Sequence, residues 1–560
     1  PSLPQLQSLD LSSNSIGAEG AAALAQSLPS LPQLQSLNLS FNSIGDEGAA
    51  ALARVLSQKP PPCLTELVGV TLKDHLEIMQ LPPELGDAKN NQILEYLRET
   101  RLREAVRMDI VKVVLTGLGG CGKTCIVRRL ADGIFDGNTI MTDGMEVRSL
   151  AMQGADSDST TMEFLIYDLG GQDVYRTSHK LFLRTSAVFL VAWDPIDGEA
   201  IAMEYAQDVQ NASPGAPMIF VSTKCDVDRQ SCSTDLDLQV QRLQAEFPET
   251  FKAHCDVSAK TNVGLDGLLV ALTTTANQLE HVGRPVPASY RVLRESVEEL
   301  RQSAFAIGYD DFLSVARQTG LQGETSAETA LELFHAWGVI LRLPSHGQGA
   351  APIVLQPSDL ADVLRRVVTA NPDNVLFCRD GILRHGEAAQ IWEDYDEKYH
   401  EYFIALLHES TIGFEIATHD AEGNIVRYGE TLIPAMLRST ADASIFQELL
   451  ASNPSLPRQA RCRVTLSALP KPLALRLQVS LRVLMVMRGW WEGGCYLVMG
   501  KRERLVSVGC MSFDLQSKSI EVACYGSEEM YVRVLEILGR LMRRDFPGIE
   551  VKNLELICPD

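Results

Sequence analysis

The stretch that decides the fold runs from residue 111 to residue 124 and reads Val-Lys-Val-Val-Leu-Thr-Gly-Leu-Gly-Gly-Cys-Gly-Lys-Thr. Its first half alternates apolar residues with Lys112 and then becomes continuously apolar, as an interior strand of a covered sheet does. Its second half, from Gly117 to Thr124, has the GxxxxGKT spacing of a phosphate-binding loop. Together these features predict a buried strand, a glycine-rich turn and a helix that continues through Leu130.

The residue types in this turn suit the binding of a nucleotide phosphate. Glycines let backbone N–H groups converge on a phosphate without Cβ atoms in the way, and the helix N-terminus adds partial positive charge. Lys123 can reach the β- and γ-phosphates, and the Thr124 hydroxyl can ligate Mg²⁺. The residues expected to hold the phosphates are Gly117, Leu118, Gly119, Gly120, Cys121, Gly122, Lys123, Thr124 and Cys125.

Length and composition describe a multidomain protein of ordinary globular type. The 560 residues predict roughly three or four domains. A hydrophobic content of 45% with 22% charged residues is typical of folded domains. The formal net charge of −22 argues against broad binding to nucleic acid or to an anionic membrane, because a polyanion would be repelled.

The spacing of the cysteines predicts reduced thiols and a cytoplasmic protein. All 12 are scattered, without the paired CxxC or Cys/His spacing of a zinc site or a disulfide framework. Neither a secretory leader nor an uncharged apolar run of membrane-spanning length occurs in the sequence. Because the sequence opens at Pro1 inside a repeat, we expect it to be a piece of a longer protein.

Residues 1–62 contain a tandem repeat. Leu-Pro-Gln-Leu-Gln-Ser-Leu-Asp-Leu-Ser at 3–12 recurs with one change at 31–40, and each copy runs on into Asn-Ser-Ile-Gly and an Ala-rich helical stretch. The LxxLxL pattern followed by Asn is the signature of a leucine-rich repeat. Asn14 and Asn42 are expected to bond the backbone of the turn, and a ligand would bind the concave strand face.

Residues 63–107 are expected to connect the repeats to the next domain. A run of prolines at 60–62 interrupts the array, and residues 63–90 carry no regular pattern. A charged amphipathic helix is expected from Asn91 to Arg107. Its buried positions would be Ile93, Leu94, Leu97 and Leu102.

From residue 108 to residue 282, strands and helices alternate as in a doubly wound parallel sheet. The strand Met162–Tyr167 runs into Asp168-Leu-Gly-Gly-Gln, where Asp168 can hold Mg²⁺ and the Gly171 N–H can contact a γ-phosphate. Gln172 is placed to orient an attacking water. The catalytic candidates are therefore Gln172 and Lys123, and the metal candidates are Thr124, Asp168 and Thr142, the last also a sensor of the γ-phosphate.

Two later loops carry groups suited to guanine. The strand Met218–Ser222 ends in Thr223-Lys224-Cys-Asp226, and the Asp226 carboxylate can accept from both N1 and N2 of guanine, whereas adenine offers an acceptor at N1. Lys224 can lie along the base plane. Thr223 is the first residue of this base-binding motif, a position at which asparagine is more common. The backbone N–H groups of Ser258, Ala259 and Lys260 are expected to meet the guanine O6.

These motifs, in this order and each at a strand's end, resemble the Ras-like small GTPase domain. Asp-Val-Tyr-Arg-Thr-Ser-His-Lys-Leu-Phe at 173–182 and Thr-x-Gly-Met-Glu at 142–146 resemble the Roc domain (Ras of complex proteins) of the Roco family. The rest of the chain is similar to the COR region (C-terminal of Roc). That similarity lies in 283–290, 330–343, 381–384, 432–437 and 490–494.

With repeats, Roc and COR in that order, the chain is identified as a member of the Roco family. The expected fold class is a leucine-rich repeat solenoid fragment, a Ras-like doubly wound α/β P-loop GTPase domain and a mixed α+β COR region. The expected domains are 1–62 (partial repeats), 63–107 (linker and connector helix), 108–282 (Roc) and 283–560 (COR).

The resemblance implies an Mg²⁺-dependent protein that binds GTP and GDP and hydrolyses GTP slowly, as a molecular switch in intracellular signalling. It also implies homodimerisation through COR and an unidentified protein ligand of the repeats. Two alternatives stay open: a nucleotide-bound scaffold with negligible turnover, and the front part of a longer Roco protein kinase. None of the kinase motifs occurs within the 560 residues.

Overall fold

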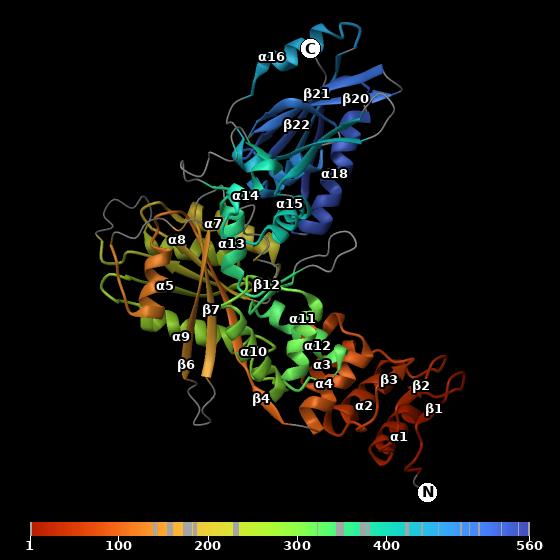
Figure 1. Cartoon of the computed structure of the whole chain (residues 1–560). Helices are drawn as coiled ribbons and strands as arrows, with labels where there is room; N and C mark the ends of the chain where they lie inside the picture. Colours follow the sequence, from red (N-terminus) through yellow and green to blue (C-terminus); the bar gives the residue numbers. More distant parts are fainter. Residues whose placement is uncertain are drawn as a thin grey trace.

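The computed structural model of the chain describes residues 3–102, 104–137, 142, 144–153, 161–171, 182, 187–227, 235–321, 323–342, 352–369, 378, 381–410, 412–419, 425–437, 441–456, 458–481, 484–491, 493–501, 504–527, 529–546 and 548–557. Gln172 and the stretch 173–181, which carry part of the predicted site and of the Roc resemblance, lie outside these residues. The predicted fold class is confirmed, since a repeat solenoid, a Ras-like sheet and mixed α+β units follow one another along the chain (Figure 1).

The repeat region forms a parallel three-stranded sheet backed by helices. Strands β1 (Ser8–Asp10), β2 (Ser36–Asn38) and β3 (Glu66–Val68) pair in register, and helices α1 (Ala18–Ser27) and α2 (Gly45–Gln58) pack on each other. The third strand lies in residues 63–90, which we expected to be irregular. Its three residues are too short a run to be recognised from the sequence.

Asparagine side chains hold the turns of this solenoid, as expected for Asn14 and Asn42. Both amides donate to carbonyl oxygens of the turn, and Asn42 Oδ1 also accepts from a backbone N–H of the first repeat. Asn90, at the start of the connector helix, does the same for the third turn: its amide donates to Leu67 O (2.9 Å) and its oxygen accepts from Leu72 N (3.0 Å).

The connector helix is a buried structural element. Short helical turns at 73–75, 76–79 and 83–87 lead to α4 (Asn90–Leu102), in which Ile93, Leu94 and Leu97 are buried as predicted, while the Leu102 side chain lies outside the described part. Tyr96 donates to Pro285 O (3.0 Å). The helix ends at residue 102, earlier than expected, because Ala105–Arg107 forms strand β4 and pairs with β11 (Pro285–Pro287).

The central sheet has the order β10-β9-β8-β5-β7-β6, and all its neighbours are parallel except β6 and β7. Its strands are β5 (Asp109–Thr116), β6 (Met145–Gln153), β7 (Thr161–Leu169), β8 (Ala187–Trp193), β9 (Met218–Ser222) and β10 (Phe251–Asp256). Its helices are α5 (Lys123–Asp132), α7 (Glu199–Ala212), α8 (Leu236–Glu246) and α9 (Leu265–Ala276). Apolar residues of α5 and α9 pack on one face of the sheet and those of α7 and α8 on the other.

The region after the central sheet holds two three-stranded sheets among helices. Its first part has α10 (Ala288–Leu300), β12 (Ala306–Ile307), α11 (Tyr309–Gln318), α12 (Glu324–Ala336), β13 (Leu341–Arg342), β14 (Ile353–Val354) and α13 (Pro357–Arg365). Its second part has β15 (Ile382–Arg384), short helices at 385–387, 388–391, 397–399 and 434–436, α15 (His400–Glu409), β16 (Phe414–His419) and β17 (Ile425–Leu432).

The C-terminal part is a six-stranded antiparallel sheet with its own core. Helix α16 (Ala443–Ala451) precedes β18 (Arg458–Leu466), α17 (Lys471–Ser480), β19 (Met485–Trp491), β20 (Gly494–Lys501), β21 (Arg504–Asp514), β22 (Ser519–Gly526), α18 (Glu529–Asp545) and β23 (Val551–Ile557). Among the helices described here and above, none combines the length and apolar character needed to cross a membrane.

Lys112 occupies an unusual place in this fold. It is fully buried in β5, its ammonium donates to Phe182 O (2.5 Å), and it lies 4.5 Å from the centre of the Tyr167 ring. The Tyr167 hydroxyl donates to Gly338 O (2.6 Å), directly after α12. Burial lowers the pKa of Lys112 to about 7.

Lys112→Met is therefore expected to flatten the pH dependence of stability. Between pH about 7 and the ordinary lysine pKa of 10.5, the unfolded chain holds a proton that the folded chain has released. Raising the pH through this window therefore stabilises folded wild-type protein, by up to about 1.4 kcal/mol per pH unit.

Thermal unfolding of wild type and variant, from about pH 6.5 to about pH 9, checks this expectation. The midpoint of the wild type should rise relative to that of Lys112→Met as the pH increases. The exposed Lys252→Met serves as the matched control and should follow the wild type. Parallel curves for wild type and Lys112→Met would show that Lys112 does not titrate in this window.

Candidate functional site

The glycine-rich turn between β5 and α5 forms a cradle around a lysine ammonium. Gly117 has φ of 143°, and a Cβ there would lie 2.1 Å from Ala192 O, so only glycine fits at this position. Helix α5 begins at Lys123, whose side chain folds back over the turn. Its buried ammonium donates to Gly117 O (2.8 Å) and Leu118 O (2.9 Å).

Three oxygen-bearing side chains converge beside this lysine. Thr124 Oγ1 lies 2.5 Å from both Thr142 Oγ1 and Asp168 Oδ2, and Thr142 Oγ1 lies 3.3 Å from the same carboxylate oxygen. The other oxygen, Asp168 Oδ1, is buried and has no hydrogen-bond partner among the described residues. Burial also raises the pKa of the Asp168 carboxyl. Hydroxyl and carboxylate oxygens are the ligands that Mg²⁺ prefers, and the unpaired buried oxygen fits a cation there.

Gly171 packs directly on the cradle. Its carbonyl accepts from Gly119 N (2.9 Å), and a Cβ at Gly171 would lie 2.3 Å from that nitrogen and 2.5 Å from Lys123 Nζ. The Tyr205 hydroxyl of α7 also donates to Gly171 O (3.0 Å), a contact that the sequence pattern did not indicate. The neighbouring Gly170 N donates to Gly144 O (2.7 Å), which joins the two loops expected to respond to a γ-phosphate.

The loop after β9 is tied to the same cradle. Thr223 Oγ1 donates to Cys121 O (2.6 Å), so the residue that replaces the commoner asparagine still links the two loops. Lys224 adopts a left-handed conformation (φ 57°), and its ammonium lies 2.9 Å from Asp194 Oδ2. Asp194 was not predicted, because the contact exists only in the folded sheet.

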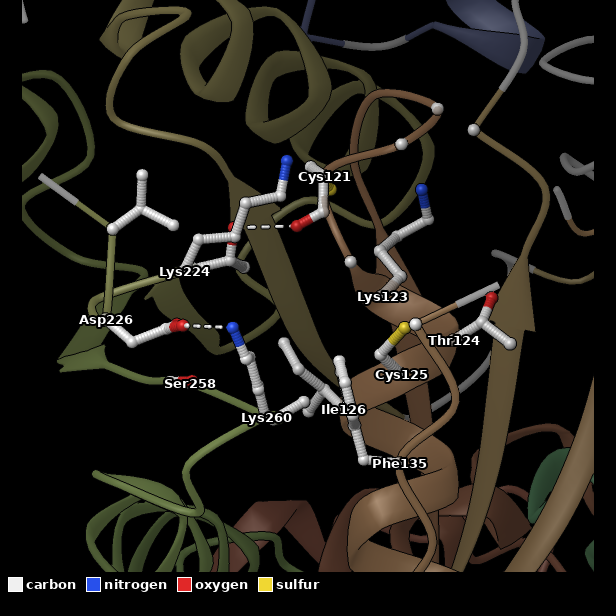
Figure 2. A pocket seen from close by; sticks show the side chains of 18 of the residues that line it. Cys121, Lys123, Thr124, Cys125, Ile126, Phe135, Lys224, Asp226, Ser258 and Lys260 are labelled. Atoms are coloured by element: carbon white, nitrogen blue, oxygen red, sulfur yellow. Dashed lines mark hydrogen bonds and ion pairs between the residues drawn. The ribbon is translucent and has the colours of Figure 1, made fainter. Parts of the chain in front are cut away.

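The predicted residues surround one cavity of about 360 Å³, a size typical of small-ligand sites. Figure 2 shows Lys224, Asp226 and Lys260 facing Lys123 and Thr124 across it. Its predicted lining residues are Gly119, Gly120, Cys121, Gly122, Lys123, Thr124, Cys125, Thr142, Gly171, Thr223, Lys224, Asp226, Ser258, Ala259 and Lys260. It is also lined by Ile126, Phe135, Gly137 and Val227, for which the sequence pattern gave no signal.

Three predicted residues act on the cavity indirectly. Gly117 and Leu118 accept from Lys123, and Asp168 accepts from Thr124, but none of the three lines the cavity. On the other side, Lys260 Nζ lies 3.9 Å from Asp226 Oδ2.

Family comparisons assign three successive parts of the chain. Residues 3–25 and 31–53 match the family described as Leucine Rich repeat, and residues 112–226 match "Ras of Complex, Roc, domain of DAPkinase". Residues 287–437 match "C-terminal of Roc, COR-A domain". The chain belongs to the Roco family. As a Roco protein with a Roc match, it also belongs to the GTPase superfamily.

Curated relatives resemble this Roco chain along much of its length. It is 25% identical over 465 residues to probable serine/threonine-protein kinase pats1 of Dictyostelium discoideum, over 78% of this chain and 14% of that protein. It is 23% identical to leucine-rich repeat serine/threonine-protein kinase 1 of Mus musculus, over 55% of this chain and 17% of that protein. This Roco chain therefore spans less than a fifth of either relative.

A small GTP-binding protein and a solved structure are also similar. GTP-binding protein ypt2 of Schizosaccharomyces pombe is 26% identical over 160 residues, which cover 28% of this Roco chain and 76% of ypt2. The structure of Methanosarcina barkeri Roco2 RocCORdC bound to GDP aligns with a TM-score of 0.48 and 21% identity, over 60% of this chain and 98% of that one.

Proposed function

We propose that this Roco chain binds GTP with Mg²⁺ in the cavity, hydrolyses it to GDP, and signals through the difference between the two states. The observation that carries the proposal is that most of the described phosphate candidates and all of the described base candidates line one cavity, within a chain that has a Roc match. Phosphate groups would lie on the cradle and the base between the loops after β9 and β10.

At the phosphate end, Lys123 would exchange the carbonyls of Gly117 and Leu118 for β- and γ-phosphate oxygens. Thr124, Thr142 and Asp168 would hold Mg²⁺, and the ion would supply positive charge to offset the negative charge of the phosphates. Gly171, already packed against Gly119, would move away when a γ-phosphate is present and donate its N–H to it. This displacement is the difference between the two states.

At the base end, the Asp226 carboxylate would accept from the guanine N1 and N2 donors. Ser258 N already donates to Val263 O (2.9 Å), so the amides of Ala259 and Lys260 would meet the guanine O6. The aromatic ring of Phe135 would pack against the nucleoside.

For hydrolysis, Gln172 would orient the attacking water. Hydrolysis would be slow, because a Ras-like site gains most of its rate from a positive group supplied in addition to these residues. Such a group would come from a partner or from a second copy of the chain.

Removal of the metal tests this proposal. With wild-type protein, GDP should bind more tightly in Mg²⁺ than in EDTA, and ADP should bind weakly in both. Thr124→Ala is expected to shrink the Mg²⁺ effect by roughly tenfold or more, because it deletes a direct metal ligand.

The exposed Thr274→Ala on α9 is the matched control for loss of a threonine hydroxyl. It should retain the wild-type Mg²⁺ effect. Equal GDP affinity in Mg²⁺ and EDTA for the wild type would contradict the metal assignment, and equal affinity for GDP and ADP would contradict guanine binding.

We also propose that the chain forms a homodimer through the C-terminal sheet. Strand β23 is the last in the sheet order, and Val551, Leu554 and Leu556 on it are 51%, 54% and 65% exposed. An apolar edge strand pairs readily with a second copy of itself about a two-fold axis. Sedimentation over a dilution series tests this, and a monomer mass at every concentration would contradict it.

We place the chain in the cytoplasm, consistent with the ten described cysteines, which are all free thiols. The concave face of the repeats would bind a protein partner. A pull-down that compares the wild-type chain with a variant whose β1 and β2 side chains are replaced would test this.

A further inference from the structure

Behind the two loops that would hold the base lies a partly buried polar cluster that the proposed function does not use. Ser222, the last residue of β9, is fully buried and donates from Oγ to Asp256 Oδ1 (2.7 Å). Its Oγ also lies 2.8 Å from His254 Nε2. The two strands are parallel neighbours, and Ser222 is the register partner of Asp256.

The proton count of this cluster fixes its chemistry. A serine hydroxyl has one proton, and here Asp256 receives it. His254 must therefore carry a proton on Nε2 and donate it to Ser222 Oγ. A serine that is buried and gives its proton to a carboxylate is not a nucleophile, and the cluster is a bridge between two strands.

The bridge lies at the base of two loops, the first of which is tied to the glycine-rich turn while the second is held by contacts of its own. After Ser222, the Thr223 hydroxyl donates to Cys121 O (2.6 Å). After Asp256, Ser258 N donates to Val263 O (2.9 Å), and Gly264 approaches so closely that a Cβ there would lie 2.1 Å from Asp256 O.

The described contacts between the two loops include an ion pair, in which Lys260 Nζ lies 3.9 Å from Asp226 Oδ2. Two backbone hydrogen bonds cross between them, from Val257 N to Ser222 O (2.8 Å) and from Cys225 N to Val257 O (3.1 Å). The Ser222 bridge is a partly buried side-chain link, and its acceptor is a carboxylate, which makes it stronger than a neutral hydrogen bond.

We infer that Ser222 is a positioning residue that sets base selectivity by holding these two loops at the distance that guanine requires. The inference rests on the proposed function. Asp226 lies on the first loop and the amides of Ala259 and Lys260 on the second, so guanine spans the gap between them. Bidentate recognition by a carboxylate depends on geometry more steeply than phosphate binding does.

Loss of the bridge should therefore weaken guanine recognition more than binding of a base that makes fewer contacts. Inosine diphosphate is the suitable probe, because it keeps N1–H and O6 but lacks the N2 amine. Ser222→Ala is expected to weaken GDP binding about tenfold, the effect of one lost charge-assisted hydrogen bond, and IDP binding only about twofold. The GDP-to-IDP affinity ratio would fall about fivefold.

The experiment measures GDP and IDP affinity by isothermal titration on the full chain. Thr275→Ala is the matched control, because it also deletes a buried hydroxyl that bonds a helix carbonyl (2.8 Å), ten residues along α9 from the loops. It should leave the ratio at the wild-type value even if stability falls. Asp256→Asn, which keeps the shape of the bridge but removes its charge, should lower the ratio less than Ser222→Ala.

Several outcomes would overturn the inference. An unchanged GDP-to-IDP ratio in folded Ser222→Ala would do so, as would an equal fall in Thr275→Ala. If Ser222→Ala does not fold, an unchanged ratio in Asp256→Asn overturns it. Failure of the proposed function is distinguishable, because wild-type protein would then bind neither GDP nor IDP better than ADP.

Discussion

Lys123→Ala is expected to lose tight nucleotide binding. The ammonium is buried in the cradle, within 2.8 and 2.9 Å of two backbone carbonyls, at the position where β- and γ-phosphate oxygens would replace them. Two charge-assisted hydrogen bonds to phosphate would be lost, which corresponds to a fall in affinity on the order of 100- to 1,000-fold. Titration of a fluorescent GDP analogue with the purified chain measures the change.

The control for this substitution is Lys252→Ala, which removes an exposed lysine from the start of β10. It should bind as the wild type does. Removal of the ammonium also leaves the carbonyls of Gly117 and Leu118 without this donor, which could destabilise the chain. Thermal unfolding without nucleotide is therefore the check that Lys123→Ala is folded. Unchanged affinity in Lys123→Ala would mean that the cradle does not bind the phosphates.

Asp226→Asn is expected to exchange guanine preference for xanthine preference. A carboxylate accepts from both guanine N1–H and the N2 amine, but the asparagine amide accepts only at its oxygen and donates at its nitrogen. Xanthine carries an oxygen where guanine carries the N2 amine, so it matches the asparagine. GDP affinity should fall by roughly 100-fold or more, since buried polar groups left unpaired reject a ligand strongly.

A competition experiment between GDP and xanthosine diphosphate (XDP) checks this exchange. Wild type and Asp226→Asn are measured in parallel. Asp237→Asn removes a comparable carboxylate from an exposed position in the first turn of α8 and should keep the guanine preference. If Asp226→Asn retains tight GDP binding and gains none for XDP, Asp226 does not contact the base.

Much of this fold could be predicted because its signals are local. The strand predicted at 218–222 has the same bounds as β9, since it is an apolar run that ends in polar residues. The glycine and lysine spacing of the cradle identifies its chemistry as well, because such a turn leaves little choice of residue at Gly117.

Other elements have no local signal. Strand β6 is an antiparallel edge strand in which charged residues alternate with apolar ones, and it was not predicted. The sequence of the connector helix α4 is typical of a charged surface helix, yet Glu99 is buried. There Ser326 of α12 donates a hydrogen bond to it (2.7 Å). The burial of Glu99 depends on a partner 227 residues away along the chain.

The site followed the same division. Residues within the motifs could be proposed as site candidates from the sequence, whereas Tyr205, Asp194 and Ser222 could not, because each contacts a loop from another element. A tyrosine, an aspartate or a serine at such a position belongs to no motif of fixed spacing, so the sequence alone does not identify it. Only the packing of the sheet shows which loop each one holds.

Single-turnover hydrolysis of bound GTP tests most directly whether this Roco chain is a GTPase. Purified protein would be loaded with GTP in Mg²⁺, over a dilution series, and GDP formation followed with Lys123→Ala as the blank. We expect GDP to form faster than in the blank, and the rate to rise with protein concentration if a second copy completes the site. GTP that stays intact at every concentration would contradict the claim and would indicate a nucleotide-bound scaffold.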